Sequence, residues 1–140
     1  MLHTPPLIAI VDPDPACRDM LRDLLDEEGY QVVACADARA ALPLLADRRP
    51  DVMIVDVGPA LGAVKCHTQR LVRYSTPGRP TSVILCSTDP RLALERPPAL
   101  HDLSCATLTK PFGIDALLSL VRAALRQAGE SERKVGDDGS

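Results

Sequence analysis

The sequence is poor in aromatic side chains, which make up 2% of its 140 residues, and it contains no tryptophan. Single-stranded nucleic acids are usually bound by stacking on aromatic rings, so this scarcity argues against such a binding platform. The formal net charge of −3 also argues against a general polyanion binder, which would carry excess lysine and arginine. We therefore expect no direct contact with nucleic acid. Because 46% of the residues are apolar, we expect one domain with an aliphatic core.

The sequence also has no closely paired cysteines and no long apolar run, and its first residues do not have the pattern expected of a secretory leader. Its five cysteines form no C-x-x-C pair and its three histidines are scattered, which argues against disulfides and a zinc site. No apolar run approaches ~18 residues, the length that spans a membrane as a helix. The N-terminus has no basic segment followed by a long apolar stretch. These absences predict a cytoplasmic protein with reduced cysteines and no membrane contact.

Short apolar segments alternate with helical patterns along the chain. The expected strands cover residues 7–11, 31–36, 52–55, 83–86 and 105–108. The expected helices run from Pro15 to Gly29, over residues 38–46 and 61–73, and from Ile114 to Ala128. Such alternation predicts an α/β fold, a doubly wound parallel sheet with helices on both faces.

Prolines and polar segments limit these elements. Pro43 should kink or shorten the second helix, because proline lacks an N–H and clashes with the preceding turn. Pro97 and Pro98 cannot continue a helix that begins at Asp89, so we expect a shortened or broken fourth helix. Residues 1–6 are expected to form an N-terminal tail, and the Gly-, Ser- and charge-rich residues 129–140 a flexible C-terminal tail. The domain would then occupy residues 7–128.

Polar side chains follow four of the expected strands. Asp12 follows the first, Asp56 the third, Ser87 the fourth and Lys110 the fifth. Taken singly, each has a simpler explanation as a turn or cap, but the carboxyl ends of parallel strands meet at one functional edge. Oxygen ligands there suit Mg²⁺, a lysine suits a phosphoryl group, and a carboxylate can form an acyl phosphate. The four residues together predict phosphoryl transfer to an aspartate.

The sequence resembles the receiver domain of two-component response regulators, the CheY-like superfamily. Four stretches carry the resemblance: IAIVDPDPACRDML, PDVMIVDV, VILCST and LTKPFGIDALLSLV. It covers about residues 7–127 and implies a five-stranded sheet in the order 2-1-3-4-5. Pro111 matches the family's proline that usually follows a cis peptide bond.

The resemblance also assigns roles to single residues. It implies that Asp56 is the phospho-accepting aspartate and that Lys110 and Ser87 stabilise the phosphoryl group. Ser87 is also implied to be the switch hydroxyl. A metal site is implied at Asp12, Asp56 and the backbone carbonyl of Gly58.

Four departures from the family pattern stand out. Pro13 replaces the second acid, usually a direct metal ligand, so Mg²⁺ binding stays open and Asp14 is a candidate substitute. The loop after Asp56 is shorter than is usual in the family. Thr107 occupies the place of the aromatic switch residue. Pro97-Pro98 interrupts the helix that carries much of the family's output surface.

We therefore predict a single-domain, stand-alone response regulator receiver rather than an enzyme. Asp56 would accept a phosphoryl group from a histidine kinase or a phosphotransfer protein, and output would pass to a downstream protein or a homodimer. One alternative is an atypical pseudo-receiver, a protein–protein interaction module without Mg²⁺-dependent phosphorylation. A remote alternative is a haloacid-dehalogenase-like phosphatase with Asp12 as nucleophile, although the later acidic pair and cap insertion of that family are missing.

Overall fold

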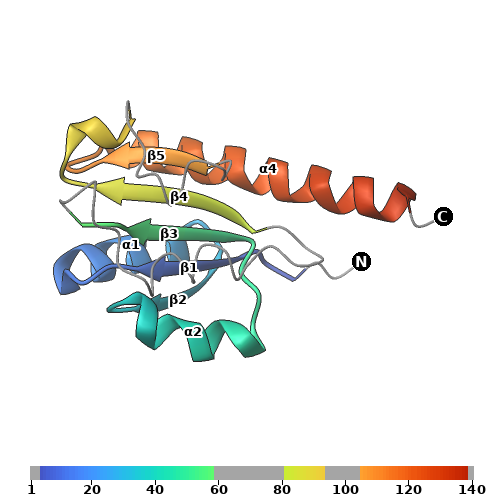
Figure 1. Cartoon of the computed structure of the whole chain (residues 1–140), viewed down its shortest axis with the longest axis horizontal. Helices are drawn as coiled ribbons and strands as arrows, with labels where there is room; N and C mark the ends of the chain where they lie inside the picture. Colours follow the sequence, from blue (N-terminus) through green and yellow to red (C-terminus); the bar gives the residue numbers. More distant parts are fainter. Residues whose placement is uncertain (1–3, 59–80, 94–104, 139–140) are drawn as a thin grey trace.

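The computed structural model describes residues 4–58, 81–93 and 105–138, and its elements follow the predicted order (Figure 1). They are β1 (Leu7–Val11), α1 (Pro15–Glu27), β2 (Gln31–Cys35), α2 (Ala38–Asp47), β3 (Val52–Asp56), β4 (Ser82–Ser87), the short 3-10 helix η1 (Pro90–Ala93), β5 (Cys105–Thr109) and α4 (Ile114–Asp138). The strands form one parallel sheet in the order β2-β1-β3-β4-β5. The predicted doubly wound fold and strand order are confirmed.

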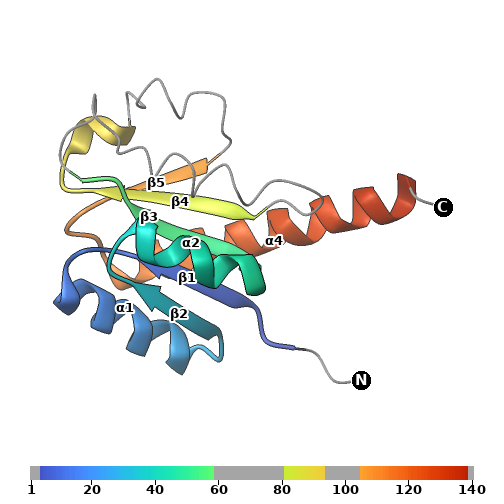
Figure 2. The ribbon, with the colours of Figure 1, turned by 60° about the horizontal axis from the view of Figure 1, so that its bottom comes forward.

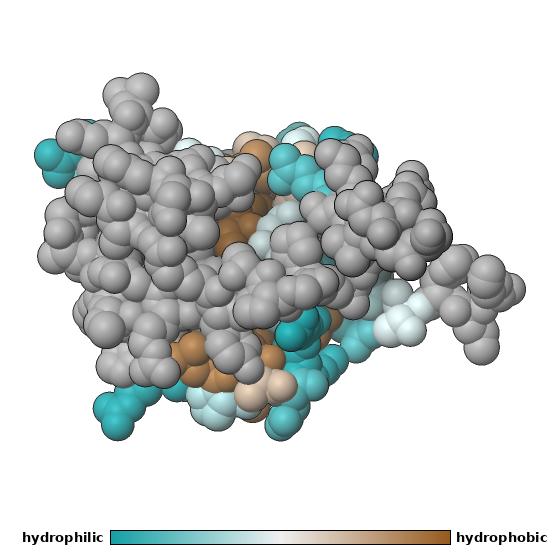
Figure 3. Space-filling model, turned by 45° about the vertical axis from the view of Figure 1, so that its right-hand side comes forward, coloured by the Kyte–Doolittle hydropathy of each residue, from teal (hydrophilic) through white to brown (hydrophobic). Residues whose placement is uncertain are grey.

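The central residues of β1, β3 and β4 are apolar and buried, as expected where helices cover both faces of a parallel sheet (Figure 2). Successive strand residues point to opposite faces. Val55 and Leu85 pack with Leu45 of α2 on one face. Their neighbours Ile54 and Ile84 pack on the other face with buried residues of α1 and α4. In space-filling view, hydrophobic side chains of the described residues gather toward the middle and lower part of the face shown, with hydrophilic ones mostly around them (Figure 3).

Helix α1 begins directly after the first strand end. The Asp14 carboxylate accepts a hydrogen bond from the Ala16 amide at 3.1 Å, and Pro15 occupies the first turn, where no N–H partner is needed. After the helix, Gly29 adopts a φ of 90°, a conformation that side chains with a Cβ rarely adopt. The chain then enters β2, beside β1.

Pro43 was expected to kink or shorten the second helix, and the helix is not shortened. Helix α2 runs for ten residues through Pro43, and Asp37 caps it by accepting a hydrogen bond from the Ala40 amide at 2.7 Å. Pro43 lies on the exposed side of the helix. Water can therefore bind the carbonyl that the missing N–H leaves without a partner, which lowers the cost of the proline.

Helix α4 begins at Ile114 as predicted but ends later than predicted. Its first residue, Ile114, is 55% exposed, whereas Leu117 and Val121 are fully buried. The helix also continues to Asp138, where a flexible tail was expected from residue 129, and extends past the sheet (Figure 1). Extending an existing helix needs no new nucleation, and residues 130 and 132–134 are good helix formers, although Gly129 and Gly136 are not.

Two expectations fall largely outside the described residues. The helix predicted over residues 61–73 lies outside them entirely. Of the predicted fourth helix, only the turn η1 is described, and Pro97-Pro98 lies beyond it.

Pro43→Ala should stabilise the domain. Alanine restores an N–H to the helix and removes the ring, so the free energy of unfolding should rise by about 1–2 kcal/mol in urea titrations. Pro43→Gly is the matched control, because it restores the same N–H but adds glycine's helix penalty of about 1 kcal/mol. An alanine variant no more stable than the parent would show that the exposed carbonyl costs nothing.

Candidate functional site

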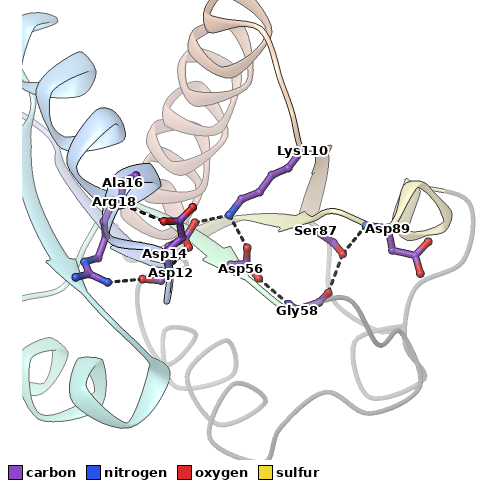
Figure 4. A network of polar contacts seen from close by, with 9 residues as sticks. All are labelled: Asp12, Asp14, Ala16, Arg18, Asp56, Gly58, Ser87, Asp89 and Lys110. Atoms are coloured by element: carbon purple, nitrogen blue, oxygen red, sulfur yellow. Dashed lines mark hydrogen bonds and ion pairs between the residues drawn. The ribbon is translucent and has the colours of Figure 1, made fainter.

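The residues predicted at the strand ends come together in the structure. The Lys110 ammonium lies 2.6 Å from Asp12 Oδ2 and 2.6 Å from Asp56 Oδ2 (Figure 4). Asp12 follows β1, Asp56 ends β3 and Lys110 follows β5, so the three are distant in sequence. Their side chains are 4%, 10% and 14% exposed, in that order. The carboxyl edge of the sheet thus holds a largely buried ammonium shared by two carboxylates.

Backbone amides orient both carboxylates. Asp12 Oδ1 accepts a hydrogen bond from the Asp14 amide at 2.9 Å, and Asp56 Oδ1 accepts one from the Gly58 amide at 2.7 Å. The second oxygen of each carboxylate is then left for Lys110. Each group therefore has a defined direction before any ligand arrives.

Two opposing effects act on the Lys110 ammonium. Burial by itself lowers the pKa of a lysine, because the charged form loses solvation. The hydrogen bonds and negative charges of Asp12 and Asp56 outweigh burial, and they hold the pKa of Lys110 above its usual value. Lys110 therefore carries its charge throughout the physiological pH range.

Ser87 connects the end of β4 to the loop after β3. Its fully buried hydroxyl donates a hydrogen bond to the Gly58 carbonyl at 2.7 Å and accepts one from the Asp89 amide at 3.0 Å. Gly58 has a φ of 81°, in the left-handed region that favours glycine. In this conformation its amide faces Asp56 and its carbonyl faces Ser87 (Figure 4).

The other predicted residues lie outside this network or at its edge. The Asp14 carboxylate caps α1 and is exposed. Thr107 is half-buried and pairs with Leu85 in the middle of β5. The Lys110–Pro111 peptide bond is cis, as the resemblance implies.

Sequence reasoning missed two residues of α1 that contact Asp12. The Arg18 guanidinium donates a hydrogen bond from Nη1 to the Asp12 carbonyl at 2.9 Å. Burial raises the pKa of the Cys17 thiol to about 11, and a hydrogen bond to Asp12 adds to this rise. The available signal was their position in the first turn after a functional aspartate, which brings them back over the strand end.

Three cysteine side chains described by the structure carry raised pKa values and are protonated thiols. Cys17, Cys35 and Cys86 are free. Burial raises the pKa of Cys86 to about 12, and burial also raises the pKa of Cys35. All three pack in or against the two apolar cores.

A five-stranded doubly wound α/β domain with paired acids and a lysine at its carboxyl edge defines a receiver-type signalling domain. The chain belongs to the family of response regulator receiver domains, whose model matches residues 8–122. Members of this family are signalling modules of two-component systems.

Curated relatives share the whole receiver region. The chain is 36% identical over 138 residues to the response regulator MprA of Mycolicibacterium vanbaalenii, covering 97% of this chain and 54% of that protein. It is 32% identical over 133 residues to the transcriptional regulatory protein KdpE of Mycobacterium tuberculosis, covering 92% and 56%. The chain thus spans about half the length of the curated relatives it matches.

Solved structures support the fold. The Vibrio cholerae chemotaxis response regulator CheY4 aligns with a TM-score of 0.70 at 24% identity, over 87% of this chain and all of that one. NtrX from Brucella abortus aligns with a TM-score of 0.75 at 24% identity, over 96% of this chain and 30% of that one.

Within the described residues, no helix combines the length and apolar character needed to cross a membrane.

Receiver domains generally use Mg²⁺, but the described residues do not fit such a site. Among them, no group of three or more His, Cys, Asp or Glu side chains is placed to hold a metal ion. Asp12 and Asp56 share Lys110, the Gly58 carbonyl accepts from Ser87, and Asp14 caps α1.

Lys110→Met should destabilise the domain because it leaves Asp12 and Asp56 facing each other without a cation. We expect a loss of about 2–4 kcal/mol in the free energy of unfolding near neutral pH. This deficit should shrink on mild acidification, since protonation of one carboxyl relieves the repulsion. Lys110→Arg, which keeps the charge, should lose less.

The parent protein should behave differently with pH. A lysine with a raised pKa contributes its full stabilisation below the unfolded value of ~10.4 and loses it only as the pH rises through the folded value. Urea titrations of the parent, Lys110→Met and Lys110→Arg, from mildly acidic pH to above ~10.4, test the shrinking deficit of the methionine variant and the alkaline loss of stability in the parent. A deficit of the methionine variant that grows toward acid pH would contradict the assignment of Lys110 as the neutralising cation.

Proposed function

We propose that this receiver domain acts in a phosphorelay and accepts a phosphoryl group on Asp56. The donor would be a phosphohistidine of a histidine kinase or a phosphotransfer protein. The observation that carries the proposal is the 2.6 Å contact between Lys110 Nζ and Asp56 Oδ2. It places a permanent positive charge where the transferred group would add negative charge.

The transfer balances as a single displacement. An oxygen of the Asp56 carboxylate forms a bond to phosphorus, the bond from phosphorus to the histidine nitrogen breaks, and the imidazole leaves with that electron pair. The product is an acyl phosphate on Asp56. The Lys110 ammonium, which contacts the Asp56 carboxylate before transfer, would then contact the phosphoryl oxygens on Asp56.

Asp56 suits this role better than Asp12. Asp12 is the more buried of the two, with a 4% exposed side chain, and its backbone carbonyl is tied to Arg18. Asp56 lies beside the Gly58 amide and within one hydrogen-bonded step of Ser87, both of which can donate to phosphoryl oxygens. This difference, together with the family assignment, favours a receiver over the phosphatase alternative.

The response would begin at Ser87. To reach a phosphoryl oxygen on Asp56, its hydroxyl must leave the Gly58 carbonyl, which also releases the loop that follows β3. Thr107 offers no aromatic ring to follow this movement. We therefore propose that the change passes through Ser87, Asp89 and η1 to a downstream protein or a second copy of the chain.

A pseudo-receiver is the second candidate function. Its support is the Lys110 bridge, which neutralises the acids without a metal, together with Pro13 at the place of the second acid. Such a domain would bind its partner without a change of state at Asp56.

Phosphorylation of Asp56 is tested with acetyl phosphate and with a phosphorylated histidine phosphotransfer protein as donors. Intact mass should increase by one phosphoryl group, and the adduct should be cleaved by hydroxylamine. Asp56→Asn should abolish the adduct, whereas Asp14→Asn, which keeps a good helix cap, should retain it. No adduct from either donor would favour the pseudo-receiver, and an adduct on Asp56→Asn would place the acceptor elsewhere.

Ser87→Ala should separate modification from response. It removes a buried hydroxyl and both of its hydrogen bonds, at a cost of about 1–2 kcal/mol in stability. Asp56 should still be modified by beryllofluoride, but the shifts of amide NMR signals from β4 and η1 should become smaller than in the parent. Ser87→Thr keeps the hydroxyl and should preserve them. Equal shifts in the parent and the alanine variant would exclude Ser87 as the switch.

A further inference from the structure

The oxygen atoms expected to ligate a divalent ion already bind groups of the protein itself. Lys110 Nζ donates to Oδ2 of Asp12 and to Oδ2 of Asp56, at 2.6 Å each. Backbone amides hold both Oδ1 atoms, at 2.9 Å and 2.7 Å. A divalent ion between these carboxylates would have to compete with an ammonium that has two short, largely buried contacts.

The backbone carbonyl expected to complete the metal shell is also engaged. The Gly58 carbonyl accepts the Ser87 hydroxyl at 2.7 Å, and this hydroxyl is held from its other side by the Asp89 amide. A carbonyl oxygen has two lone pairs, so this hydrogen bond weakens Gly58 as a metal ligand without excluding it. The resting position of Lys110 is therefore the main obstacle to a metal ion, and that of Ser87 adds to it.

The β1–α1 connection adds no further acid. Pro13 is exposed and has no ligating atom in its side chain. Asp14 uses its amide to orient Asp12 and its carboxylate to cap α1. Turning that carboxylate toward the site would uncap the helix, so Asp14 does not replace the missing ligand.

Charge leads to the same conclusion. Two carboxylates and one ammonium leave a net charge of about −1 at this edge of the sheet, which is little to attract a divalent ion that dehydrates reluctantly. A third carboxylate at position 13 would leave about −2 and supply a further ligand.

We propose that Lys110 is the resident cation of this site, and that residue 13 makes the domain independent of Mg²⁺. The closed network of Lys110, Asp12, Asp56, Gly58 and Ser87 takes the place of the metal centre. The inference rests on the proposed function only for its last part, namely that any phosphoryl transfer to Asp56 proceeds equally well with a chelator.

Mg²⁺ titration followed by amide NMR tests the proposal without any phosphoryl donor. The parent should show no saturable shifts of Asp12, Asp56 or Gly58 up to about 10 mM Mg²⁺. Pro13→Asp should show saturable shifts, with an affinity at least about tenfold above the parent's limit. Pro13→Ala, which removes the ring but adds no acid, should behave like the parent. Asp14→Asn should also leave the titration unchanged.

Two further measurements keep the test decisive. The NMR spectrum itself reports whether Pro13→Asp folds, and Lys110→Met, which frees both Oδ2 atoms, should gain Mg²⁺ affinity by an independent route. Saturable shifts in the parent that disappear in Asp14→Asn would identify Asp14 as a ligand and overturn the proposal. A folded Pro13→Asp variant without Mg²⁺ binding would overturn the role of position 13.

The two proposals can fail separately. Adduct formation on Asp56 that requires Mg²⁺ would retain the phosphorelay function and overturn the metal-independent centre. If no adduct forms, but only Pro13→Asp binds Mg²⁺, the phosphorelay function fails and the metal-free centre stands.

Discussion

The bridge from the Lys110 ammonium to Asp12 and Asp56 is the interaction on which the rest of the site depends. Without it, two largely buried carboxylates would face each other across adjacent strands, in surroundings that screen charge poorly. The strand order places Asp12 and Asp56 at the ends of the adjacent strands β1 and β3, so their charges need a nearby cation. β5 is separated from β3 by β4, or roughly 10 Å at the usual strand spacing, and a long lysine side chain is suited to reach across. The Lys110 amide donates a hydrogen bond to the Ser87 carbonyl at 2.8 Å, and this bond positions the backbone from which the Lys110 side chain extends.

The two apolar cores hold this polar edge in place. Strands β1 to β4 send alternate residues into the core beneath α2 and the core beneath α1 and α4. The site residues lie at or directly after the strand ends, so the hydrogen-bonded sheet holds their backbones in place. The Ser87–Gly58 contact, by contrast, joins a strand end to a loop. Within the described site, it is the contact best placed to change without disturbing either core.

Much of the fold could be predicted because buried parallel strands have a strong local signature. Runs such as residues 52–55 and 83–86 are apolar and bounded by turns, and they became β3 and β4 with small extensions. Local rules failed where exposure decides the outcome. Pro43 is tolerated because it faces water, and Ile114 has an apolar side chain but no core to enter. The polar residues after 128 extend α4 without any apolar pattern, because an existing helix can grow without a new nucleus.

The sequence by itself determined the family, the five strands and the identity of the acids, hydroxyl and lysine at their ends, since these depend on residue type and order along the chain. It also determined that position 13 carries no acid. Only the tertiary structure decided how these groups are used: which oxygens Lys110 occupies, that Ser87 binds the Gly58 carbonyl, and that Asp14 caps a helix. The physical reason is that hydrogen bonds depend on direction and distance in space. Residues 54 and 98 positions apart acquire both only when the sheet forms.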